Sequence, residues 1–194
     1  MSEDIEHLIL EAKGAALKGE QNRARALFRR ALKMDPDNLE ALIAFGVMLN
    51  SSRKSAEQGM KYLARAVRLD PANGLAWAHL GESLILLKQY DKAEDYIRKA
   101  IKLNPENARN WHRLGNVLEK KNQDDEAIEM IRRSLDIDDT EETAWISLGR
   151  IYVKLKRYEE AYDAFFYALK LDPNNSYIKD SIGKVESLLQ KEDS

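Results

Sequence analysis

The chain has 194 residues, of which 44% are hydrophobic and 33% are charged, a composition typical of a globular rather than a disordered protein. Its formal net charge of −2 gives no basic excess, so the overall charge favours neither nucleic acid nor an anionic membrane as a partner. Cysteine is absent, which excludes disulfides, thiolate nucleophiles and cysteine metal sites.

Apolar residues recur at three- and four-residue spacings along the chain, as amphipathic helices require. In chain order the pattern predicts five pairs of helices followed by an eleventh helix, and no strand. The first helix of each pair is expected near 5–18, 39–50, 74–87, 108–121 and 142–155. The second is expected near 22–34, 56–69, 91–103, 125–137 and 159–171, and the last helix covers 176–190.

Short polar side chains stand where several helices should begin. Asn38, Asn73, Asn107 and Asn175 share one phase of the pattern, and asparagine is a favoured N-cap. Asp91 is predicted to cap the helix that follows it. Proline helps to end the second helices because it has no backbone N–H to donate.

Landmark residues recur every 34 residues. Trp77, Trp111 and Trp145 keep this step, and Leu-Gly follows three residues after each of them. The step is also kept by Ala93, Ala127 and Ala161, and by Pro71, Pro105 and Pro173, with Asp139 where a further proline would stand. Two weaker copies lie upstream, one of them with an added residue near 51–56. Five repeats therefore cover 5–38, 39–73, 74–107, 108–141 and 142–175.

Four glycines fall inside predicted first helices, at Gly46, Gly81, Gly115 and Gly149. A glycine inside a helix costs roughly 0.8–1 kcal/mol relative to alanine. We therefore expect each of them to allow a close approach between the two helices of its pair, and we assign these landmarks to the core.

With these landmarks the chain resembles the tetratricopeptide repeat (TPR) family over most of its length. The resemblance implies an all-α fold, a right-handed α-solenoid of five helix-turn-helix TPR hairpins, forming a single domain over 1–194. The helix at 176–190 carries apolar residues on one side and charged residues on the other. It is predicted to be a capping helix, because the end of a solenoid otherwise exposes an apolar face.

In the family, the first helix of each hairpin lines a concave groove that receives an extended or helical segment of a partner. The helical phase then gives a groove with an apolar end at Ile9, Ile43 and Val47 and a basic end on the last two repeats. The candidate partner-binding residues are Ile43, Val47, His79, Glu82, Arg109, His112, Arg113, Asn116 and Arg150.

The arginines at the basic end stand on one predicted face with few acids. Some family members hold the acidic tail of a chaperone with a two-carboxylate clamp, and Arg109 and Arg113 match one basic pair of that clamp. Ile43, Val47 and His79 stand where its lysine and asparagines should be, so the full clamp is absent. Arginine binds carboxylates bidentately, which suits an acidic peptide segment, and ordinary solvated charge is the alternative interpretation.

Catalytic chemistry has little support in the sequence. His79, Glu82 and His112 could contribute to a metal site, but Arg113 nearby would repel a cation, and solvated groove residues are the simpler interpretation. Motifs for a nucleophile turn, a phosphate-binding glycine loop or a zinc helix are absent. We therefore predict no enzyme activity, no cofactor and no metal.

The sequence thus favours a protein–protein interaction scaffold that binds another protein, with no nucleic-acid partner. The alternatives are a self-associating structural adaptor, which uses the apolar groove end at Ile9, Ile43 and Val47 or the divergent first hairpin, and a metal-dependent enzyme. The first seven residues lack the basic start and apolar core of a signal peptide, and no stretch approaches the ~18–20 apolar residues that span a bilayer. A cytoplasmic location without membrane insertion is therefore expected.

Overall fold

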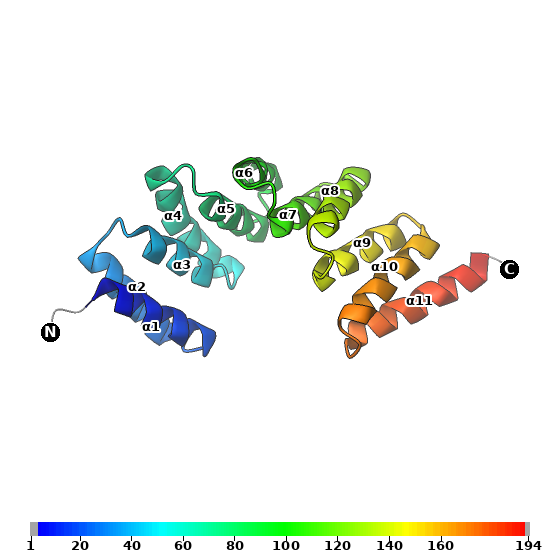
Figure 1. Cartoon of the computed structure of the whole chain (residues 1–194), viewed down its shortest axis with the longest axis horizontal. Helices are drawn as coiled ribbons and strands as arrows, with labels where there is room; N and C mark the ends of the chain where they lie inside the picture. The colour runs from blue at the N-terminus through cyan, green and yellow to red at the C-terminus, as the bar shows by residue number, and fades with distance from the viewer. Residues whose placement is uncertain (1–3, 193–194) are drawn as a thin grey trace. The chain divides into compact units, whose positions relative to one another are not determined.

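The computed structural model describes residues 4–192, which form eleven α-helices and contain no strand (Figure 1). This confirms the all-α prediction. The chain divides into two compact units, Met1–Asn104 and Pro105–Ser194, which are described separately below. Residues 1–3 and 193–194 of the predicted domain lie outside the described residues.

Unit 1 consists of three antiparallel helix pairs (Figure 1). The first helices are α1 (Ile5–Leu17), α3 (Leu39–Leu49) and α5 (Gly74–Leu86), and the second helices are α2 (Gln21–Met34), α4 (Arg53–Leu69) and α6 (Tyr90–Leu103). Unit 2 contains the first helices α7 (Ala108–Lys120) and α9 (Glu142–Lys154), the second helices α8 (Asp124–Ile137) and α10 (Tyr158–Leu171), and α11 (Ser176–Glu192). These bounds agree closely with the predicted ones.

Asparagine side chains cap three of the four helices for which the sequence predicted them. The side chains of Asn38 and Asn73 each accept a hydrogen bond at 3.0 Å from the backbone N–H three residues on, and Asn175 accepts one at 3.3 Å. Asn107 precedes α7 but makes no such bond. The assignment of Asp91 was wrong: α6 begins at Tyr90, and Asp91 lies in its first turn, where a negative charge still favours the positive end of the helix dipole.

The turn inside the second pair differs from the others. In the remaining pairs the turn contains one residue in the left-handed region, at Gly19 (φ 78°), Lys88 (φ 60°), Asn122 (φ 60°) or Lys156 (φ 58°). The added residue near 51–56 removes the need for such a conformation between α3 and α4. Ser52 instead accepts a hydrogen bond from the Ser55 N–H at 3.4 Å, so α4 begins at Arg53 rather than near 56.

The glycines of the first helices mark close approaches to the second helices, as predicted. A Cβ placed on Gly46, Gly81, Gly115 or Gly149 would lie 2.5–2.9 Å from a side chain of the paired helix, namely Leu63, Ile97, Ile131 and Phe165 in turn. Real Cβ atoms do not come this close to other atoms. Each glycine therefore sets the distance at which its two helices pack.

The three tryptophans bond the first helices α5, α7 and α9 to the loops that precede them. The indole Nε1 of Trp77 donates a hydrogen bond to the Pro71 carbonyl at 3.0 Å, and that of Trp111 donates to the Pro105 carbonyl at 2.7 Å. Trp145 makes the same bond to the carbonyl of Asp139 at 2.9 Å. Because the acceptor is a backbone oxygen, aspartate can replace proline at this position without loss of the contact.

Candidate functional site

Helix α3 is apolar on two sides, although only one of them faces the core. Leu42, Phe45 and Leu49 are each 1% exposed and belong to the hydrophobic core of unit 1. The other side carries Ile43, which is half-buried against the core, and Val47 one turn on, which is 36% exposed; Glu40 is the only charged residue between Leu39 and Leu49. A helix that is apolar all round is normally buried on all sides. The exposed apolar side of α3 is therefore a candidate binding surface.

This side of α3 is the floor of an apolar groove of about 850 Å³ between α1 and α5. Its walls include two leucines that are much more exposed than leucine usually is in a folded protein, Leu17 at 91% and Leu75 at 54%. The lining residues are Lys13, Ala16, Leu17, Gln21, Phe28, Leu39, Glu40, Ile43, Ala44, Val47, Met48, Asn73, Leu75 and His79. Most of these residues are apolar, and they are contributed mainly by first helices.

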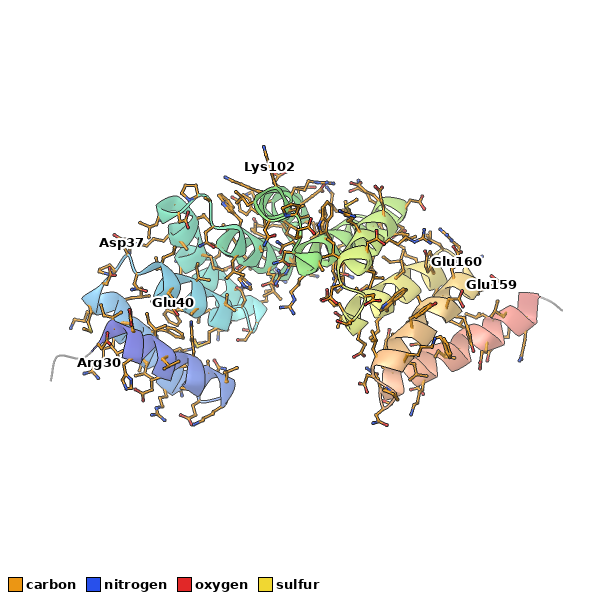
Figure 2. The ribbon with its side chains drawn as sticks, viewed as in Figure 1. Arg30, Asp37, Glu40, Lys102, Glu159 and Glu160 are labelled. Atoms are coloured by element: carbon orange, nitrogen blue, oxygen red, sulfur yellow. The ribbon has the colours of Figure 1, made fainter. Side chains whose placement is uncertain are left out.

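The polar groups of the groove are mostly occupied by one another. Lys13 on α1 donates to Glu40 at 2.5 Å, and Figure 2 shows Glu40 at the start of α3. Asn73 caps α5, and the Nδ1 of His79 lies 2.6 Å from an oxygen of Glu82. Among the described residues that line the groove, Gln21 is the polar side chain without a hydrogen bond.

The structure places the predicted residues of unit 1 as follows. Ile43, Val47 and His79 line the groove, and Glu82 is held against His79 beside it. The assignment of Ile9 to the apolar end was wrong, because Ile9 is 2% exposed and packs in the core of unit 1. Sequence reasoning missed Leu17 and Leu75, which lie in the last and first turns of their helices, where the helical phase assigns a face least well.

In unit 2 the face formed by α7 and α9 is polar and tightly hydrogen-bonded. His112 was expected in an open groove, but it is 7% exposed and its Nε2 lies 3.0 Å from the hydroxyl of Ser147 on α9. Its Nδ1 lies 3.4 Å from Glu141, and Asn116 lies 3.0 Å from its Nε2. His112 and Asn116 therefore join α7 to α9 rather than standing free in solvent.

The three arginines of this face already have partners in the chain. Arg150 pairs with Glu119 at 2.6 Å, Arg109 lies 3.9 Å from Glu141, and Arg113 donates to the Asn110 side chain at 2.9 Å. The expectation of a face with few acids was wrong, because Glu119 and Glu141 lie among the arginines. Arg109 remains the most open of the three, with its side chain 70% exposed.

Glu141 makes this polar face sensitive to acid. Its hydrogen bond with the His112 side chain, together with the charge of Arg109, lowers the pKa of the Glu141 carboxyl below its ordinary value of 4.5. A lowered pKa in the folded state stabilises the fold above the unfolded-state pKa, and this stabilisation is lost as pH falls through the folded-state value. We expect the stability advantage of the wild type over Glu141→Gln, measured by urea unfolding, to be present at pH 6 and to shrink below pH 4.5. An advantage that does not change with pH would contradict this account.

Within residues 4–192 there is no group of three or more His, Asp or Glu side chains that could hold a metal ion. No helix in this part of the chain is long and apolar enough to cross a membrane.

Comparison with known proteins places this fold in a family. The family model described as the tetratricopeptide repeat protein 21 C-terminal ARM domain matches residues 3–183. The chain belongs to the tetratricopeptide repeat family. Its fold is an all-α helical-repeat solenoid of the TPR type, as the resemblance implied.

Solved TPR structures resemble it over most of its length. MamA is 26% identical, covers 84% of this chain and 94% of its own, and superposes with a TM-score of 0.71. PilF of Pseudomonas aeruginosa is 19% identical with a TM-score of 0.80, over 96% of this chain and 90% of its own. YrrB, described as a TPR protein with an unusual peptide-binding site, is 21% identical with a TM-score of 0.65, over 84% of each chain. PilF and YrrB show the fold alone.

Proposed function

We propose that this TPR protein is a protein–protein interaction scaffold, and that its groove on α1, α3 and α5 binds an amphipathic helix of a partner protein. The observation that supports this is the apolar outer side of α3, with Ile43 and Val47 at the floor of the groove between the exposed Leu17 and Leu75. Exposed apolar surface of this kind marks interaction sites in soluble proteins. YrrB, a protein of the same fold, is described as having a peptide-binding site.

The chemistry of the groove favours a helical occupant over an extended one. An extended segment would bring unpaired backbone N–H and C=O groups into the groove, and these need partners. The polar lining groups are largely engaged already, as in the Lys13–Glu40 pair and the Asn73 cap. A helix satisfies its own backbone and presents apolar residues at three- and four-residue spacings, which matches a groove walled by leucines.

Photo-crosslinking in cells tests this proposal. We would place a benzophenone side chain at Leu75, which lines the groove, and at Leu10, which is 69% exposed but lies outside the groove lining. The Leu75 probe should capture a partner segment with apolar residues at helical spacing, and the Leu10 probe should not. Identical products from both sites, or captured segments without that spacing, would contradict the proposal.

Self-association is the second candidate, because the same exposed leucines could be covered by a second copy of the chain. A mass measurement by light scattering at tens of micromolar separates the two ideas. A monomer in the wild type leaves the groove for another protein. A dimer that Val47→Gln converts to a monomer would assign the groove to self-association.

The predicted role of Arg109, Arg113 and Arg150 stays a proposal that the partner also carries carboxylates. Exposed ion pairs contribute about 0–1 kcal/mol each, and Glu119 and Glu141 already compete for two of these arginines. Arg109→Glu combined with Arg113→Glu should therefore weaken partner binding far less than a change in the apolar groove.

A further inference from the structure

Two second helices of unit 1, α2 and α4, are rich in basic residues and poor in acids. Helix α2 contains five arginine or lysine residues and no acid, and α4 contains five and one acid, Glu57. Helices α8 and α10 of unit 2 carry mostly aspartate and glutamate. The net charge of −2 averages these opposite regions. The net charge of the whole chain therefore conceals a positive electrostatic potential on the second helices of unit 1.

Part of this charge surrounds a cleft of about 390 Å³ between α4 and α6. Lys61 and Arg68 on α4 and Lys92 on α6 line it, and the described residues lining it include no acid. Lys61 and Arg68 are seven residues apart, which places them on one side of α4. The floor between the three cations is apolar, formed by Met60, Ala64, Leu80 and Leu84.

These three cations have no carboxylate partner in residues 4–192. Other basic residues on the same two helices do: Arg65 on α4 pairs with Asp37, and Arg98 on α6 pairs with Glu94. Like charges gathered around a cleft repel one another and raise the local concentration of anions. The cleft is therefore complementary to a ligand that supplies negative charge.

We propose that this cleft binds an acidic segment of a partner protein. Carboxylates of the segment pair with Lys61, Arg68 and Lys92, and an apolar side chain between them contacts the floor. The apolar floor distinguishes such a segment from nucleic acid, whose sugar–phosphate backbone offers no matching group, and which is gripped by phosphate contacts and stacking. It also argues against a membrane surface, because the apolar residues are recessed rather than protruding for insertion. This site is separate from the groove on α1, α3 and α5.

The test is fluorescence anisotropy with a labelled peptide of aspartate and glutamate around a central leucine. The variant Lys61→Glu/Arg68→Glu/Lys92→Glu should bind this peptide at least about tenfold more weakly than the wild type, because three attractive ion pairs become repulsive. The matched control is Lys33→Glu/Arg53→Glu/Lys102→Glu, which changes the net charge equally outside the cleft lining. Figure 2 shows Lys102 pointing outward from α6. The control should change the affinity less than about threefold.

A second variant tests the floor without changing charge. Ala64→Gln fills the cleft, so it should weaken the peptide with the central leucine but not the same peptide with glycine there. Equal affinity of the wild type and the cleft triple variant would overturn the proposal. So would tighter binding of duplex DNA or of phosphatidylserine vesicles at the same salt concentration. Salt-sensitive self-association that the triple variant abolishes would also overturn it, by assigning the cleft to a second copy of the chain.

Discussion

Gly115→Ala is expected to destabilise unit 2 by about 1–3 kcal/mol or more, although the same change usually strengthens a helix. The new Cβ would lie 2.5 Å from Cγ1 of Ile131 and 3.0 Å from the backbone carbonyl of Ala127. Ile131 is fully buried and the carbonyl belongs to helix α8, so neither can move aside easily. The helices α7 and α8 would have to separate, which would disrupt their packing.

Gly183 provides the matched control, because it stands 34 residues after Gly149 in the same phase of the repeat. Nothing lies within 4 Å of the position of its Cβ, since α11 has no second helix packed against this side. Gly183→Ala should therefore stabilise the protein by about 0.5–1 kcal/mol. Urea unfolding of the two variants measures both effects. Similar changes in stability for Gly115→Ala and Gly183→Ala would show that the glycines do not set the helix spacing.

Deleting residues 176–194 should lower the stability by several kcal/mol and lead to aggregation. Helix α11 packs on α10 through Ile178 and Val185, which are 0% and 1% exposed. Full burial of one such side chain contributes about 1.5–3 kcal/mol, and the deletion would also expose the apolar surface of α10 beneath them. Phe166 and Tyr167 on α10 are already 41% and 48% exposed, so further exposure would create a large apolar patch.

The control for this deletion removes residues 191–194 only and keeps the buried side chains of α11. The melting temperature, with light scattering to detect aggregation, should separate the two shortened proteins clearly. If the protein ending at residue 175 remained a soluble monomer with an unchanged melting temperature, α11 would not be a cap.

The helices could be predicted from the sequence because the repeat supplied the same signals several times. The tryptophan, Leu-Gly and proline positions fixed the phase, so the predicted helix ends differ little from the observed ones. The start of α4 is the exception. It depends on how one added residue changes a turn, where Ser52 becomes the cap, and no other repeat carries that turn.

The candidate site was less predictable, because a helical phase assigns a side chain to a face but not to a partner. Arg150 and Glu119 are 31 residues apart in the chain, and their ion pair depends on how α7 packs beside α9. The burial of His112 against Ser147 has the same cause. The basic cleft between α4 and α6 was missed for a different reason. The basic residues of α4 and α6 that line it were visible in the sequence, but the net charge of the whole chain concealed them.

The central claim is that the apolar groove of unit 1 binds a partner helix, and calorimetry tests it most directly. The segment captured by crosslinking at Leu75 would be titrated as a synthetic peptide into the wild type, into Val47→Gln/Leu75→Gln, and into the control Leu10→Gln. We predict that the groove variant loses at least tenfold in affinity, because two apolar contacts of about 1 kcal/mol or more each are lost. The control should bind like the wild type, and a proline in the middle of the peptide should abolish binding. Equal affinity for the groove variant and the control, or unchanged binding of the proline-containing peptide, would contradict the account.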